Sequence, residues 1–169
     1  MKRFVIVFSN EPGAPAPWVT QACASAKLAY VDNDPITKEI AKNPEAQKLL
    51  LSNIPPGENV ALAPFYKAAL EKVAGKEARI GLYSESWLLY LGQADGCVID
   101  FASLEAQKAQ GLAAGMSKKD VDEYFAKYSK QLQDRARKYL PPERILVVPS
   151  GESDAKKAEL AAAFIRKLS

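Results

Sequence analysis

Acidic side chains follow several short apolar stretches of the sequence, and these are the residues that most readily suggest chemistry. Glu11, Glu85, Asp100 and Glu152 each close or follow a run rich in Val, Ile, Leu or aromatic residues. Carboxylates gathered in one cleft can act as general bases, hold a cation, or pair with amines of a partner. Asp100 closes a very apolar run, and Glu11 lies in a proline-rich segment. Glu85 and Glu152 fit equally well as acids in the first turns of helices.

Histidine is absent from the 169 residues, and cysteine occurs only at Cys23 and Cys97. The missing histidines exclude Ser-His-Asp and Cys-His nucleophile systems and most zinc sites. Two cysteines in different predicted elements do not make a disulfide framework, so we expect free, buried thiols and a reducing, cytoplasmic location. A magnesium site at Glu11 and Asp100 stays open as an alternative, supported by only two acids.

Five short apolar runs indicate the strands that position these acids. They are residues 3–9, 28–31, 79–83, 96–101 and 144–149. Apolar residues follow one another in these runs almost without interruption, as they do in parallel strands that are buried on both faces. Longer amphipathic segments alternate with them. The pattern predicts one α/β domain over residues 1–169, with a single doubly wound, mostly parallel five-stranded sheet and helices on both faces.

Helix boundaries are marked by capping residues, prolines and glycines. Asp34 followed by Pro35 predicts a helix that runs to Asn53. Further helices are expected from about 59 to 73, ending at Gly75, from Ser117 to 140, and from 153 to 168. Since ligands of open parallel sheets bind beyond the carboxyl ends of the strands, the four acids that follow the apolar runs should meet at one edge. Such a rim would repel a nucleotide and attract a cation, an amine or a partner's Lys and Arg.

Three stretches of the sequence carry a likeness to a known family. The first strand leads into PGAPAPW at 12–18, the stretch RIGLYSESWLLYL occupies 79–91, and YFAKY at 124–128 is followed by PERILVV at 142–148. In layout these resemble the sulfotransferase branch of the P-loop nucleotide-binding proteins. The resemblance implies phosphoadenosine phosphosulfate as cofactor and binding positions at Asn10, Glu11, Gly13, Trp18 and Lys108.

The same stretches depart from that family wherever it binds phosphate. When Pro12 and Trp18 are matched to the family's Pro and Trp, Gly13 stands at the basic position, and Ala or Pro stands at the serine, glycine and threonine positions. Pro15 and Pro17 also lack backbone N–H groups. The family's second phosphate signature should fall between residues 100 and 111, where Lys108 is the only cation.

These departures predict a degenerate relative, a non-catalytic binding or regulatory protein that engages a protein or small molecule through an acidic cleft or a helical face. The alternative is a group transferase acting on a hydroxyl or amine. In that case Glu85 or Asp100 is the general base, Lys108 or Lys27 is the compensating cation, and phosphoadenosine phosphosulfate is the donor. The net charge of +3 is spread along helices, so we expect no nucleic-acid partner, and no stretch reads as a membrane span.

Overall fold

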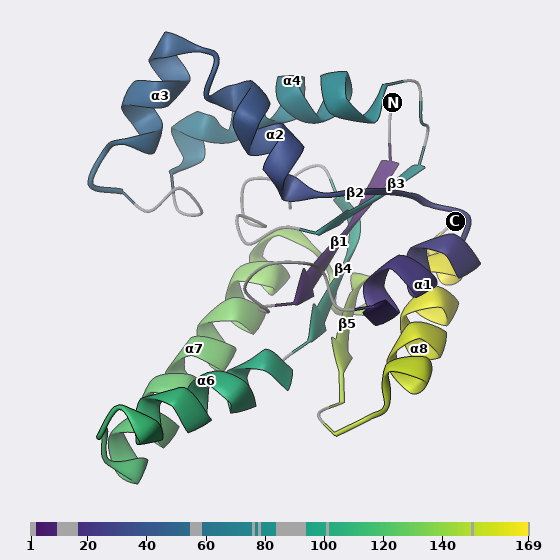
Figure 1. Cartoon of the computed structure of the whole chain (residues 1–169). Helices are drawn as coiled ribbons and strands as arrows, with labels where there is room; N and C mark the ends of the chain where they lie inside the picture. The colour runs from purple at the N-terminus through teal and green to yellow at the C-terminus, as the bar shows by residue number, and fades with distance from the viewer. Residues whose placement is uncertain are drawn as a thin grey trace.

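The computed structural model describes residues 3–9, 17–54, 59–75, 77, 79–83, 94–100, 102–149 and 151–168. Five parallel strands form its sheet, in the order β2-β3-β1-β4-β5 (Figure 1). The strands are β1 (Arg3–Ser9), β2 (Ala29–Val31), β3 (Arg79–Tyr83), β4 (Ala94–Asp100) and β5 (Ile145–Val148). β1 is central, and its Val7 lies between Tyr83 and Val98 in register.

Two hydrophobic cores lie on opposite faces of this sheet. On one face, α1 (Pro17–Ser25) and α8 (Asp154–Lys167) pack together over β4 and β5, and their core contains Trp18, Val98 and Val148. On the other face the core joins Ile80 and Ile99 to the helices between β2 and β3 and to the end of α7 (Lys118–Tyr139). Successive residues of β4 alternate between the two cores, so Asp100 points to the same side as Val98.

The segment between β2 and β3 forms what we call the helical cap, residues 33–54 and 59–74. It contains α2 (Asn33–Ile40), α3 (Pro44–Leu50), the short 3-10 helix η1 (Val60–Leu62) and α4 (Ala63–Ala74). The prediction of one helix from Asp34 to Asn53 is therefore wrong. Asn43 ends the continuity because its side chain accepts hydrogen bonds from the N–H groups of Glu45 and Ala46, with Pro44 at the first helical position.

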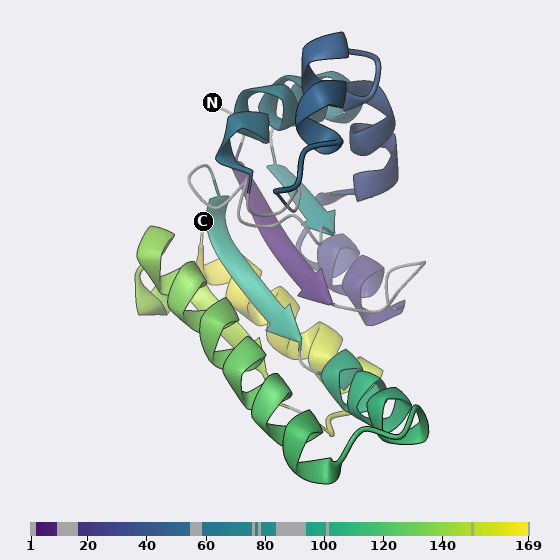
Figure 2. The same ribbon diagram turned by 90° about the vertical axis from the view of Figure 1, so that its left-hand side faces the viewer.

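Between β4 and β5 the chain forms a helical hairpin of α6 (Ala102–Ala113) and α7, which extends beyond the carboxyl ends of the strands (Figure 2). The predicted cap at Ser117 is confirmed, since its Oγ accepts a hydrogen bond from the Asp120 N–H. The two helices approach closely at Gly111, where a Cβ would lie 3.3 Å from both Met116 Sδ and Val121 Cγ2.

The structure corrects the predicted α/β fold class. The chain is mostly helical, and the strands at the two ends of the strand order, β2 and β5, have only 3 and 4 residues. The physical reason is the size of the connections, because α2, α3, η1 and α4 lie between β2 and β3, and α6 and α7 lie between β4 and β5, so that far more residues are in helices than in strands. A doubly wound sheet is thus no adequate description of the molecule.

Candidate functional site at the carboxyl edge of the sheet

The carboxyl ends of β1 and β4 lie side by side at one edge of the sheet. Ser9 and Asp100, the last residues of these strands, are paired in register. β1 lies between β3 and β4 in the strand order, so the connections that follow β1 and β4 leave from adjacent positions. In open parallel sheets this is the place where ligands bind. We therefore take this edge as the candidate site.

Asp100 forms a buried ion pair with Lys157 of α8. The Lys157 ammonium Nζ donates to Asp100 Oδ2 over 3.0 Å, and the two side chains are only 7% and 2% exposed. Charge-assisted hydrogen bonds of this kind are among the stronger ones in proteins. A buried carboxylate that already accepts from an ammonium group is not offered to a substrate as a proton acceptor.

Lys157 reaches Asp100 because of its position in α8. It precedes Ala161 and Ile165 at spacings of four, so it lies on the stripe that faces the sheet, and all three are buried. The helix is fixed at its start by Ser153, whose Oγ accepts from the N–H of Lys156. Lys157 was not among the site residues predicted from the sequence. The sequence does contain a signal for it, because a lysine on the apolar stripe of a helix indicates a buried partner of opposite charge.

Trp18 lies in the first turn of α1 and is 1% exposed. Its indole Nε1 is buried, and among the described residues it has no hydrogen-bond partner. Trp18 belongs to the core that also contains Val98, Val148 and Ala158. This placement supports packing as its main role.

Two lysines that the sequence analysis considered as cations lie elsewhere. Lys108 is on α6, where its Nζ is 3.8 Å from Asp122 Oδ1 of α7, so it joins the two helices of the hairpin. Lys27 follows α1 and immediately precedes β2, which places it at the amino edge of a parallel sheet, opposite to Asp100. The described ion pair of Asp100 is with Lys157.

Most of the other predicted site residues lie in parts of the chain that the structure does not describe. Asn10, Glu11, Gly13 and Glu85 lie outside the described residues. Glu152 is exposed and precedes Ser153, the cap of α8, so the expectation that Glu152 lies in the first turn of this helix is wrong. Asp154 is the acid in the first turn of that helix.

Both cysteines are free and buried, as predicted. Burial raises the pKa of Cys23 to about 11 and that of Cys97 to about 12, because a thiolate loses its hydration in an apolar layer. At neutral pH both are therefore protonated, and neither is a nucleophile.

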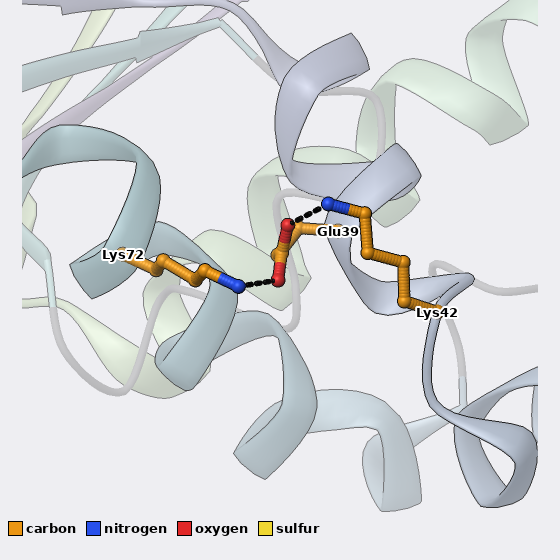
Figure 3. Close-up of polar contacts among 3 residues, drawn as sticks. All are labelled: Glu39, Lys42 and Lys72. Carbon is orange, nitrogen blue, oxygen red and sulfur yellow. Dashed lines mark hydrogen bonds and ion pairs between the residues drawn. The ribbon is translucent and has the colours of Figure 1, made fainter.

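A second feature is a surface hollow of about 320 Å³ in the helical cap. Its wall includes the side chains of Ile40, Pro44, Phe65, Ala68 and Ala69. At its rim Glu39 of α2 lies between two lysines, accepting from Lys42 over 2.6 Å and from Lys72 of α4 (Figure 3). The hydrogen bonds from Lys42 and Lys72 lower the pKa of Glu39. The two lysine side chains are 69% and 67% exposed, so solvent screens these pairs strongly.

No known protein family matches the chain, and no curated protein does either. Within the described part of the chain, none of the helices has the length and apolar character needed to cross a membrane. The described residues also contain no group of three or more Cys, Asp or Glu side chains arranged to hold a metal ion. The sulfotransferase resemblance thus rests on the sequence stretches alone.

Proposed function

We propose that the protein is a non-catalytic binding protein that engages a positively charged group of a partner at the carboxyl edge of its sheet. The observation that carries this proposal is the buried ion pair between Asp100 and Lys157. Of the two predicted catalytic residues, Glu85 and Asp100, the structure describes Asp100, and this ion pair engages its carboxylate inside the protein. An acid that is engaged in this way supports a structural role better than one in proton transfer.

The charge of the partner is argued from the acids around this edge. Glu11, Glu85 and Glu152 follow β1, β3 and β5 in the sequence, and those strands run parallel to β4. Lys157 balances the charge of Asp100, so the three glutamates supply the proposed negative potential. Such a potential attracts amines and guanidinium groups and disfavours a nucleotide with several phosphates. The absence of basic and hydroxyl residues from positions 12–18 points the same way.

A group transferase remains the alternative, with Glu85 as its general base and phosphoadenosine phosphosulfate as its donor. No described contact favours it specifically. Asp100 is engaged by Lys157, and Lys108 bridges to Asp122. A cytoplasmic location likewise stays a prediction.

The experiment is a fluorescence-anisotropy titration of a labelled hexa-arginine peptide with the protein. We expect saturable binding that weakens at least tenfold in the variant Glu11→Gln/Glu85→Gln, because the carboxyl edge of the protein loses two carboxylates. Glu45→Gln is the matched control, since Glu45 is an exposed acid on α3, and it should leave the affinity unchanged. Equal binding by both variants would show nonspecific attraction and contradict the proposal.

A further inference from the structure

The hollow in the helical cap is lined by both apolar and charged side chains. Ile40 and Ala69 of its wall are buried, and Phe65 is half-buried. Three charged side chains also line it: Glu39, Lys42 and Lys72. Its volume of about 320 Å³ is at the small end of the range of ligand pockets, about 300 to 1,000 Å³. A ligand that fits it is therefore small, with an apolar part and a polar part.

The wall of the hollow comes from two stretches of chain that pack against each other. The α4 residues in it share one face of that helix, at spacings of three and four: Phe65, Ala68, Ala69 and Lys72. Opposite them lie the end of α2 and residues 42–44, which join α2 to α3. This junction is fixed by Asn43, whose Oδ1 accepts from the N–H groups of Glu45 and Ala46 over 2.9 and 3.2 Å. A fixed wall lowers the entropy that a bound ligand must offset.

Glu39 holds the two lysines of the lining together (Figure 3). The Lys42 Nζ donates to Glu39 Oε2 over 2.6 Å, and the Lys72 Nζ donates to Glu39 Oε1, so each oxygen of one carboxylate accepts from a different ammonium group. The Glu39 side chain is mostly buried, whereas both lysine side chains are mostly exposed. Two ammonium groups are thus positioned beside the hollow before a ligand arrives, which reduces the side-chain entropy that binding costs.

The hydrogen bonds already made in the lining decide which polar group a ligand needs. An ammonium group has three N–H bonds, and in the described contacts Lys42 and Lys72 each give one to Glu39. Both oxygens of Glu39 accept from these lysines, and the Oδ1 of Asn43 accepts from the backbone. The capacity left for a ligand is therefore mainly donor capacity. A complementary ligand supplies acceptors, and two ammonium groups beside one carboxylate favour an anionic acceptor.

We propose that the hollow binds a small carboxylic acid that carries one apolar group, with its carboxylate on Lys42 and Lys72 and its apolar group against Phe65. A carboxylate has two oxygens, one for each lysine, as Glu39 shows within the protein itself. The apolar group covers the apolar part of the wall and removes it from water. This inference goes beyond the proposed function and does not depend on it, because it uses none of the acids at the carboxyl edge of the sheet.

An NMR titration of the isotope-labelled protein with phenylbutyrate tests the proposal. We expect saturable shifts at the backbone amides of the wall, among them those of Ile40, Asn43 and Ala69. Two analogues separate the parts of the ligand. Phenylbutyramide keeps the ring and lacks the charge, whereas butyrate keeps the charge and lacks the ring. Each analogue should bind at least tenfold more weakly than phenylbutyrate, because each loses one of the two contacts.

Variants of the lining test the same two contacts from the side of the protein. Lys42→Gln/Lys72→Gln should weaken the binding of phenylbutyrate at least tenfold, because the carboxylate loses both ammonium donors. Lys38→Gln/Lys48→Gln is the matched control, since it removes the same charge from exposed positions of the cap outside the lining, and it should leave the affinity unchanged. Ala68→Phe, at an exposed position of α4, should weaken binding at least tenfold by filling the hollow.

The dispersion of the amide spectrum shows whether each variant is folded before affinities are compared. The absence of saturable shifts in the wall of the hollow would overturn the proposal. Equal binding of phenylbutyrate and either analogue would also overturn it, as would equal weakening by the two double-lysine variants. A preference for the peptide Gly-Gly-Phe over phenylbutyrate would mean that the hollow takes the carboxyl end of a peptide, and it would overturn the free acid as the ligand.

Discussion

Lys157 and Asp100 form an ion pair across the interface of α8 and β4, with 3.0 Å between Nζ and Oδ2, and both side chains are buried. This pair neutralises the acid that closes β4. It also connects the last helix of the chain to the edge where β1 and β4 end. The pair therefore bears on both the stability of the fold and the chemistry of the candidate site.

Removing the lysine from this pair should strongly destabilise the protein. Lys157→Met leaves the Asp100 carboxylate buried without its partner, and we expect the free energy of unfolding to fall by about 3 to 5 kcal/mol. Urea denaturation measures the change. Lys156→Met is the matched control, because Lys156 is an exposed neighbour paired with Glu159, and it should shift stability by no more than about 0.5 kcal/mol. Equal effects of the two variants would mean that the buried pair contributes nothing special.

Replacing both members of the pair separates charge from packing. In the variant Asp100→Leu/Lys157→Met no charge remains buried, so we expect recovery of most of the stability lost in Lys157→Met. The same denaturation experiment gives the result. A double variant as unstable as the single one would indicate that volume, and not the unpaired carboxylate, causes the loss.

Gly81 should resist substitution because of its contact with Cys23. A Cβ built on Gly81 would overlap Cys23 Sγ, so Gly81→Ala forces β3 and α1 apart and should cost about 1 to 3 kcal/mol. Cys23→Ala removes the sulfur, and in that background Gly81→Ala should cost less. A double-mutant cycle measures this coupling. Additive effects would contradict the predicted overlap.

Lys27 adopts a left-handed backbone conformation, with φ 57°, after α1. Lys27→Gly should raise the free energy of unfolding by about 0.5 to 1 kcal/mol, since the strain relieved exceeds the entropy that glycine adds to the unfolded chain. Ala24→Gly is the control at an exposed position inside the same helix, and it should lower stability by about 1 kcal/mol. Thermal unfolding measures whether each variant raises or lowers the stability of the protein.

The buried thiols predict a loss of stability in alkaline solution. Their pKa values in the folded protein are raised to about 11 for Cys23 and about 12 for Cys97, from an ordinary value of 9.0. Above pH 9.0 the unfolded chain releases thiol protons that the folded protein still holds, so the free energy of unfolding falls as the pH rises. Cys23→Ala/Cys97→Ala should show a shallower decline between pH 9 and 11. Parallel curves for the two proteins would contradict these shifts.

Local sequence signals predicted much of the secondary structure. Ser117 and Ser153 cap their helices as the sequence indicates, and Gly75 ends α4 with a positive φ. The break at Asn43 was missed, although Asn followed by Pro is a strong helix start, because the apolar spacing continues across it. The predicted fold class gave the sheet too much weight, because β2 and β5 have only 3 and 4 residues and are shorter than the apolar runs that indicated them.

The candidate site was less predictable than the elements. The sequence placed Asp100 at the end of a buried strand, and the structure agrees. It did not reveal Lys157, which lies 57 residues further on, because pairing over that distance depends on how α8 packs on the sheet. The acids at the ends of β1 and β3 remain assigned from sequence, as Glu11 and Glu85 are outside the described residues.

The central claim is that the carboxyl edge binds a cationic partner and not the nucleotide of a sulfate-transfer reaction. Titration calorimetry with adenosine 3′,5′-bisphosphate and with hexa-arginine, under identical conditions, tests it most directly. We predict saturable heat with the peptide that is lost in Glu11→Gln/Glu85→Gln, and no heat of binding with the bisphosphate. Stoichiometric binding of the bisphosphate, with none of the peptide, would contradict the account.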